Sequence, residues 1–121
     1  MTNQSDELES ILQHADECYA SEDYSSAIEA LTRAADITDR HPTILRALGT
    51  QLFLSERYTW SRIIFDELTT VHPQNVDDHI LYALAAFHDE DSDSCAAALQ
   101  SALALNEDNH IALKFTAGLD V

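Results

Sequence analysis

Acidic side chains alternate in the segment DEDSDS, residues 89–94, in a pattern that could bind calcium. Carboxylates occupy its first, third and fifth positions, as they do at the start of a calcium-binding loop. Such a loop needs Gly at its sixth position and a bidentate Glu at its twelfth, where this chain has Ser94 and Gln100. The segment is therefore expected to be a solvated acidic turn.

A second candidate for chemistry is the pair His14 and Cys18, four residues apart on a predicted helix. A zinc site needs three or four ligands, and no second His/Cys pair stands at a matching position. The sequence also has no Gly-rich phosphate loop, no nucleophile elbow and no H-E-x-x-H motif. No carboxylate stands in an apolar run that would raise its pKa toward a catalytic value. We therefore expect no catalytic residues, no metal, no cofactor and no enzymatic activity.

The net charge of the chain limits the classes of molecule that it is expected to bind. The 121-residue chain has a net charge of −16, with 22 acidic residues against 6 Lys and Arg. Nucleic acids and anionic membranes attract basic proteins, so both are disfavoured as partners. Residues 1–41 hold ten acids and 76–109 hold eight acids and no base, while residues 42–75 are balanced. Such an asymmetry favours solubility, or the steering of a basic partner toward the ends of the chain.

Localisation is inferred from what the chain lacks. No apolar run reaches the roughly 18 residues that span a bilayer, and the first ten residues carry no secretory signal pattern. The two cysteines, Cys18 and Cys95, sit in apolar helical patterns and suit a reducing compartment. The expected location is the cytoplasm.

The composition indicates that any binding surface of this chain lies on helices. Ala and Leu, which favour helices, dominate its apolar residues, and Gly and Pro are scarce. Three similar phrases recur at an interval of 34 residues: YASEDY at 19–24, FLSERY at 53–58 and FHDEDS at 87–92. In each 34-residue block, apolar residues three and four apart form two helical stripes. Turns are expected near residues 21–23, 39–41, 55–57, 72–75, 89–91 and 106–109. The fold class is all-α, built from three helix–turn–helix units.

The chain resembles the tetratricopeptide repeat (TPR) proteins, whose unit is a pair of antiparallel helices. The resemblance rests on LRALG, FLSERY, Phe65 and HPQN in the middle block, on YSSAIEALTRAA in the first and on CAAALQSALALNEDN in the third. It implies a right-handed α-solenoid. The expected organisation is a disordered tail at 1–7, TPR units at 8–41, 42–75 and 76–109, and a C-terminal capping helix at 110–121.

Some positions depart from the TPR pattern. His79 and Ser92 replace large apolar or aromatic residues in the third unit, and Glu22, Glu56 and Glu90 replace Gly at the turn within each unit. We expect these departures to weaken single units without changing the fold.

The TPR resemblance also implies a binding surface, since the first helices of TPR units line a groove that holds a partner segment. Carried over by position, the groove residues are Leu12, Asp16, Tyr19, Arg46, Thr50, Phe53, Ile80, Leu84 and Phe87. Some members clamp a C-terminal carboxylate with Lys, Arg and Asn, but here the matching positions hold Leu12, Asp16, Ala47, Asp77 and Leu81. Binding of chaperone tails is therefore not expected.

The expected function is that of a scaffold that binds another protein or a peptide segment of it. One alternative is a chaperone similar to the bacterial type III secretion translocator chaperones, which match this chain in size, acidity and repeat number. Another is an N-terminal accessory domain of a larger enzyme, such as a transferase.

Self-association is a further expectation. The last twelve residues, HIALKFTAGLDV, place apolar side chains on more than one side of the predicted helix, although a terminal helix should have a polar outer face. The exposed side would be covered by a second copy, by residues beyond Val121 or by a partner protein. The residues expected to mediate a homodimer are Trp60, Ile63, Ile111 and Phe115.

Overall fold

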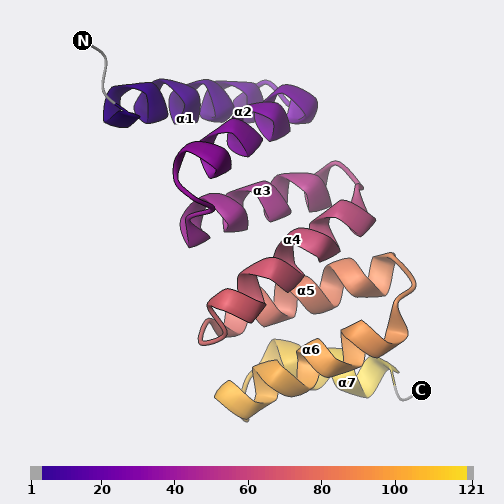
Figure 1. The fold of residues 1–121 in the computed structure, drawn as a ribbon. Coiled ribbons are helices and arrows are strands. Elements are labelled where there is room, and N and C mark those ends of the chain that lie inside the picture. Colours follow the sequence, from indigo (N-terminus) through magenta and orange to yellow (C-terminus); the bar gives the residue numbers. More distant parts are fainter. Residues whose placement is uncertain (1–3, 120–121) are drawn as a thin grey trace. The chain divides into compact units, whose positions relative to one another are not determined.

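The computed structural model describes residues 4–119, which form α-helices joined by short turns (Figure 1). Its seven helices in that range are α1 (Gln4–Ala20), α2 (Tyr24–Ile37), α3 (Pro42–Leu54), α4 (Tyr58–Val71), α5 (Val76–His88), α6 (Ser92–Leu105) and α7 (His110–Leu119). They form two compact units that divide after Arg57, and each unit is described by itself. The predicted fold class and all six predicted turns are confirmed.

The start of α1 corrects one expectation. Residues 4–7, assigned to a disordered tail, belong to the helix, and only residues 1–3 of that tail lie outside the described range. Asp6 and Glu7 stand in the first turn of α1, where the positive end of the helix dipole stabilises carboxylates. At the other end, α7 follows the expected course to Leu119, and residues 120–121 lie outside the described range.

A Schellman motif ends the first helix of each pair. At the end of α1 the Asp23 N–H donates to the Cys18 carbonyl at 2.8 Å and the Glu22 N–H donates to Tyr19 at 3.0 Å. The same two hydrogen bonds recur at the other two turns. At the end of α3 the Arg57 and Glu56 N–H groups donate to the carbonyls of Leu52 and Phe53, and at the end of α5 the Asp91 and Glu90 N–H groups donate to those of Ala86 and Phe87. This motif requires a residue in the left-handed region, and Glu22, Glu56 and Glu90 have φ of 61°, 63° and 60°. Glutamate thus occupies the backbone conformation that TPR units usually give to Gly.

The last residue of two of these turns also begins the next helix. The Asp23 side chain accepts from the Ser26 N–H at 3.2 Å, and the Asp91 side chain accepts from the Ser94 N–H at 3.1 Å. Each caps N–H groups that the helix itself leaves without a partner. Because one residue closes α1 or α5 and opens α2 or α6, three residues suffice to reverse the chain.

The first unit packs α1 on α2 and α2 on α3. Its buried apolar residues are spaced three and four apart, as the helical stripes predict: Ile11, Ala15, Cys18, Ala27, Ala30, Leu31, Ala34, Ala35, Ile44, Leu45, Leu48 and Leu52. Six of these residues are no larger than cysteine, so the helix backbones of this unit can approach closely.

The second unit packs α4 on α5, α5 on α6 and α6 on α7. Its core cluster consists of Ile80, Ala83, Ala86, Cys95, Ala98, Leu99, Ala102 and Ala112. Phe65 and Leu68 of α4 are completely buried, which confirms that Phe65 is a core residue. His79, at an apolar position of the repeat, is also buried, and its Nε2 forms a hydrogen bond of 2.7 Å with the Pro73 carbonyl. That bond satisfies one polar atom of a side chain that would otherwise weaken the unit.

The left-handed glutamates generate a stability prediction. Replacing Glu56 with Gly should stabilise the protein by about 0.5–1 kcal/mol, because Gly adopts positive φ without the steric cost that a Cβ incurs. Glu29→Gly is the matched control: it removes the same charge from an exposed site inside α2 and should destabilise by about 1 kcal/mol. Urea unfolding followed by circular dichroism measures both. Equal destabilisation by the two substitutions would contradict the account of these turns.

Candidate functional site

One repeat position carries an aromatic residue that the core does not bury. Tyr19 and Phe87 occupy it in α1 and α5, with 48% and 49% of their surface exposed, and Phe53 occupies it in α3 and is half-buried. Their carbonyls accept the hydrogen bonds of the Schellman turns, so the backbone at these positions is fixed. The other repeated stripe positions of these three helices are buried in every pair. The aromatic position is therefore held rigidly by the turn and left open to solvent.

The other residues expected to line a groove differ in exposure. In the first unit Asp16 is exposed, while Leu12, Arg46 and Thr50 are half-buried. The Thr50 hydroxyl donates to the Arg46 carbonyl at 2.8 Å and so is occupied within α3.

In the second unit Leu84 is half-buried against the core cluster, but Ile80 corrects the expectation. Ile80 is a member of that cluster with 5% of its surface exposed, because its side of α5 faces the small residues of the neighbouring helices. It contributes to packing and has almost no surface to offer a ligand.

Four rings surround the end of α5. The ring centroid of Phe87 lies 5.4 Å from that of Phe115 in an edge-to-face arrangement, and 5.6 Å from that of His88. His88 in turn stacks on Tyr58 with centroids 4.6 Å apart. Beside them lies a hollow of about 640 Å³, lined by Phe87, His88, Glu90, Ser92, Cys95 and Ala96. The hollow combines ring surface and small side chains with one acidic residue, and ligand sites are commonly lined by apolar groups with a few polar ones.

The residues expected to mediate self-association differ in how far they are exposed to solvent. Trp60 is 62% exposed, Ile63 42% and Ile111 60%, whereas Phe115 is partly buried against the core cluster. Phe115 therefore has a structural role within the second unit. Leu113 is 44% exposed, and it and Ile111 lie on opposite flanks of the buried Ala112 in α7.

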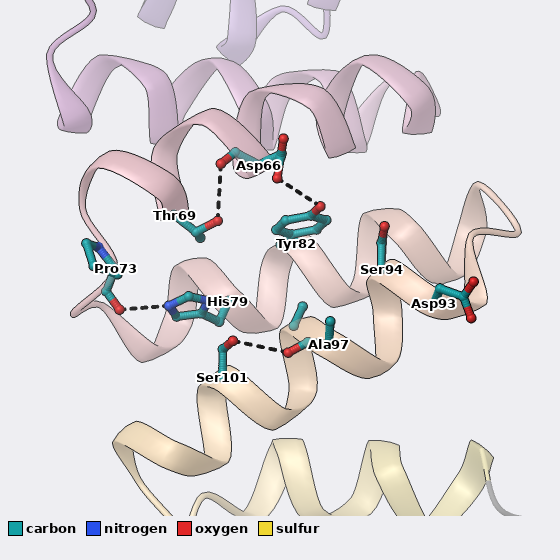
Figure 2. Close-up of a pocket in the computed structure, with 10 residues that line it drawn as sticks. Asp66, Thr69, Pro73, His79, Tyr82, Asp93, Ser94, Ala97 and Ser101 are labelled. Atoms are coloured by element: carbon teal, nitrogen blue, oxygen red, sulfur yellow. Dashed lines mark hydrogen bonds between the residues drawn. The ribbon is translucent and has the colours of Figure 1, made fainter.

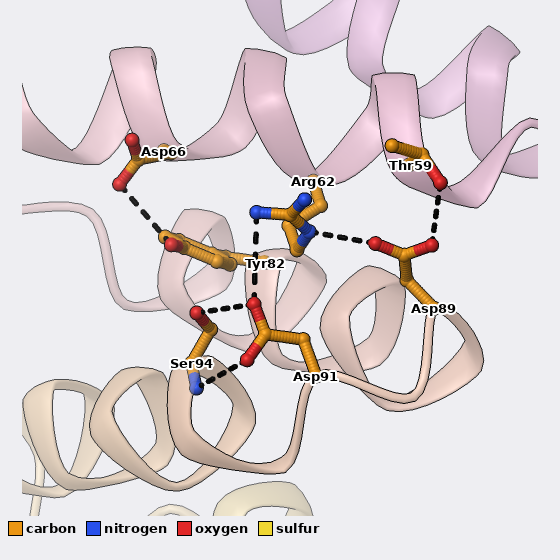
Figure 3. A network of polar contacts seen from close by, with 7 residues as sticks. All are labelled: Thr59, Arg62, Asp66, Tyr82, Asp89, Asp91 and Ser94. Carbon is orange, nitrogen blue, oxygen red and sulfur yellow. Dashed lines mark hydrogen bonds and ion pairs between the residues drawn. The ribbon is translucent and has the colours of Figure 1, made fainter.

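Arg62 connects α4 to the acidic turn before α6, a contact that the repeat pattern did not predict (Figure 3). Its Nε donates to Asp89 Oδ2 at 2.8 Å, and its guanidinium lies 3.6 Å from Asp91 Oδ2. Asp89 also accepts from the Thr59 hydroxyl. The only hint in the sequence is that Arg62 is one of two bases between residues 58 and 121, against an acid-rich turn.

These hydrogen bonds stabilise the charged carboxylates. The bonds from Thr59 and then Arg62 hold the pKa of Asp89 below its ordinary value. Bonds from the hydroxyl and N–H of Ser94 lower the pKa of Asp91, and Arg62 adds a smaller contribution. In the segment DEDSDS, two of the carboxylates are thus committed to an ion pair and a helix cap.

A second hollow of about 480 Å³ lies over α4, α5 and α6 (Figure 2). Its polar groups bond to the protein itself: Thr69 and Ser101 donate to carbonyls of their own helices, and Tyr82 donates to Asp66 at 3.1 Å. Because those groups are already engaged, the hollow offers a ligand little that the protein does not use.

The remaining candidates for chemistry stay isolated within residues 4–119. His14 Nε2 lies 3.6 Å from Cys18 Sγ, but no group of three or more His, Cys, Asp or Glu side chains in that range could hold a metal. Cys18 and Cys95 are buried without forming a disulfide, and burial raises the pKa of both thiols. None of the described helices is both long enough and apolar enough to cross a membrane.

Comparison with solved structures identifies the fold. The TPR domain of Arabidopsis OM64 superposes with a TM-score of 0.82 at 14% identity, covering 98% of each chain. The first TPR domain of Spaghetti (RPAP3), bound to the HSP90 peptide SRMEEVD, gives 0.78 at 13% identity and 94% coverage of each. A chain of the CopN–Scc3 complex gives 0.77 at 16% identity, covering 96% of this chain and 69% of that one. No family model and no curated protein matches the sequence. The protein has the TPR fold, as the sequence predicts, with three helix pairs and a C-terminal helix.

The Arg62 contacts generate a prediction about pH. A carboxylate whose pKa is lowered by folding stabilises the native state above its unfolded pKa of about 3.9, and this contribution is lost as pH falls through the lowered value. Asp89→Asn should therefore be less stable than the wild type at pH 7, and the difference should shrink as the pH falls below the ordinary pKa of an aspartate and protonates Asp89.

Urea midpoints at each pH measure this difference. Asp108→Asn, at an exposed position of the same unit, removes an equal charge and should show no such convergence. A difference for Asp89→Asn that is constant across the whole pH range would contradict the role given to these contacts.

Proposed function

We propose that this protein is a non-enzymatic module that binds a partner polypeptide on the first helices of its repeats, which are α1 and α3 in the first unit and α5 in the second. The observation that carries the proposal is the exposure of Tyr19 and Phe87 at equivalent positions of two different helix pairs. Aromatic side chains bring large contact area at a small cost in side-chain entropy, which is why interfaces favour them. A rigid turn below each ring means that little ordering is required when a partner binds.

The proposed binding residues are Leu12, Asp16, Tyr19, Arg46, Thr50 and Phe53 in the first unit, and Leu84 and Phe87 in the second. Ile80 is left out because it is buried. Three of the eight are aromatic and two are charged, so the contact would be largely apolar with a polar margin.

Two solved neighbours support a polypeptide as the ligand, since one holds the peptide SRMEEVD and another comes from a protein complex. The same peptide is a poor candidate here. It carries three acidic side chains, and this chain has a net charge of −16 with Asp16 and Asp77 at two of the positions that would form a carboxylate clamp. We therefore expect a partner segment that is not acidic.

The two alternative functions lead to different observable consequences. A secretion chaperone would hold an exported protein that is insoluble without it, so the two should be recovered together when co-expressed. An accessory domain of an enzyme such as a transferase would belong to a gene that continues past residue 121. Neither requirement applies to the scaffold.

Homodimer formation stays a prediction with revised residues. On α7 the exposed apolar residues are Ile111 and Leu113, on α4 they are Trp60 and Ile63, and Phe115 packs inward. Light scattering distinguishes a monomer from a dimer.

Substitution of the exposed aromatics tests the proposal. Tyr19→Ala and Phe87→Ala should reduce capture of the partner from native lysate by about tenfold or more, with unfolding midpoints close to that of the wild type. Phe65→Ala is the contrasting variant, because it removes a completely buried ring and should destabilise by about 3–5 kcal/mol.

Binding is compared by quantitative mass spectrometry of proteins that bind the wild type. If Tyr19→Ala and Phe87→Ala retain every partner of the wild type, the aromatic surface is not the binding site. If they unfold as readily as Phe65→Ala, these rings belong to the core.

A further inference from the structure

The hollow at the end of α5 presents ring faces and edges that no helix covers completely. Phe87, which lines it, is 49% exposed, and His88 beside it is also exposed. Both rings are held in place: Phe87 rests edge-to-face on Phe115, and His88 stacks on Tyr58. An aromatic surface of this kind attracts cations, because the ring face carries negative charge.

A carboxylate stands on the rim of the same hollow. Glu90 lines it, and its backbone is fixed at φ 60° by the Schellman turn that ends α5. The C-terminal end of α5, which bears the negative end of the helix dipole, lies at the same place. Three features of independent origin thus favour positive charge in one hollow: the rings, the Glu90 carboxylate and the helix end.

No Lys or Arg side chain lines the hollow. Residues 76–109 contain eight acids and no Lys or Arg. Arg62, the one arginine between residues 58 and 121, is committed to Asp89 and Asp91. A guanidinium bound in the hollow would therefore come from another molecule.

We infer that this hollow binds an arginine side chain of the partner segment, so that the partner is a basic polypeptide. The inference rests on the proposed function and names the chemistry of the ligand at Phe87, the aromatic binding residue of the second unit. Arginine is favoured over lysine because its planar guanidinium stacks on aromatic rings and also forms two hydrogen bonds with one carboxylate. A second copy of this chain is disfavoured as the source of that arginine, since the chain has 6 Lys and Arg against 22 acidic residues.

The test uses a pair of fluorescein-labelled peptides. One contains two arginines and two leucines in a glycine–serine background, and its twin has citrulline, which is neutral and nearly the same shape, in place of each arginine. Fluorescence anisotropy gives the two dissociation constants, and NMR shifts locate the binding site. We expect the citrulline peptide to bind at least about tenfold more weakly and the arginine peptide to shift Phe87, His88 and Glu90.

Matched variants assign the effect to the rim carboxylate. Glu90→Gln should weaken binding of the arginine peptide by about three- to tenfold. Glu56→Gln is the control, because Glu56 occupies the same turn position in the preceding helix pair with φ of 63° and its loss changes the net charge equally. Its affinity should match that of the wild type.

Three results would overturn the inference: equal affinity for both peptides, equal effects of Glu90→Gln and Glu56→Gln, or no binding at about 1 mM protein. If partner capture nevertheless depends on Tyr19 and Phe87, the proposed function stands and only the arginine assignment fails. If partner capture is also indifferent to those two rings, both fail.

Discussion

Close packing between small side chains is the constraint on which this structure depends. Eight alanines are completely buried, among them Ala27 and Ala34 in the first unit and Ala83 and Ala102 in the second. Alanine lets helix backbones approach closely, but its burial stabilises less than that of a larger side chain because the free energy scales with the apolar area removed from water. The few large core residues, such as Phe65, Leu45 and Leu68, therefore contribute a disproportionate share of stability.

Aromatic side chains lie both inside and outside this packing. Phe65 of α4 is completely buried, whereas Tyr19, Phe87 and Trp60 are exposed. Tyr19 and Phe87 occupy the last turn of their helices, and Trp60 lies on the outer side of α4. Single exposed rings are common on protein surfaces, but exposure at the same repeat position of two helix pairs motivates the assignment of a partner to that position.

Much of the fold could be predicted because the contacts that form it are local and repeat every 34 residues. The positions of the turns and the buried stripes follow from that period, and even His79 proves to be buried where the register requires. The period could not reveal Arg62, since its bonds join residues 27 and 29 positions apart and connect α4 to the turn between α5 and α6.

The sequence could predict the groove only as a set of repeat positions, and the prediction was wrong for Ile80, which is buried. The spacing of apolar residues does not show how much of the surface of α5 its neighbouring helices cover. The left-handed glutamates were visible as departures from the TPR pattern, but their cost depends on φ, which the sequence does not contain. Function follows from neither the period nor the fold, because scaffolds, chaperones and accessory domains all use such helix pairs.

Site-specific photocrosslinking tests the central claim, that the aromatic repeat position contacts the partner, more directly than any loss of binding. A benzoylphenylalanine at position 19 or 87 replaces one ring with another and should leave the surface intact. The account predicts that both positions crosslink to the same partner polypeptide, and that the same probe at position 63, exposed on α4, does not. Crosslinks formed from position 63 and absent from 19 and 87 would contradict it.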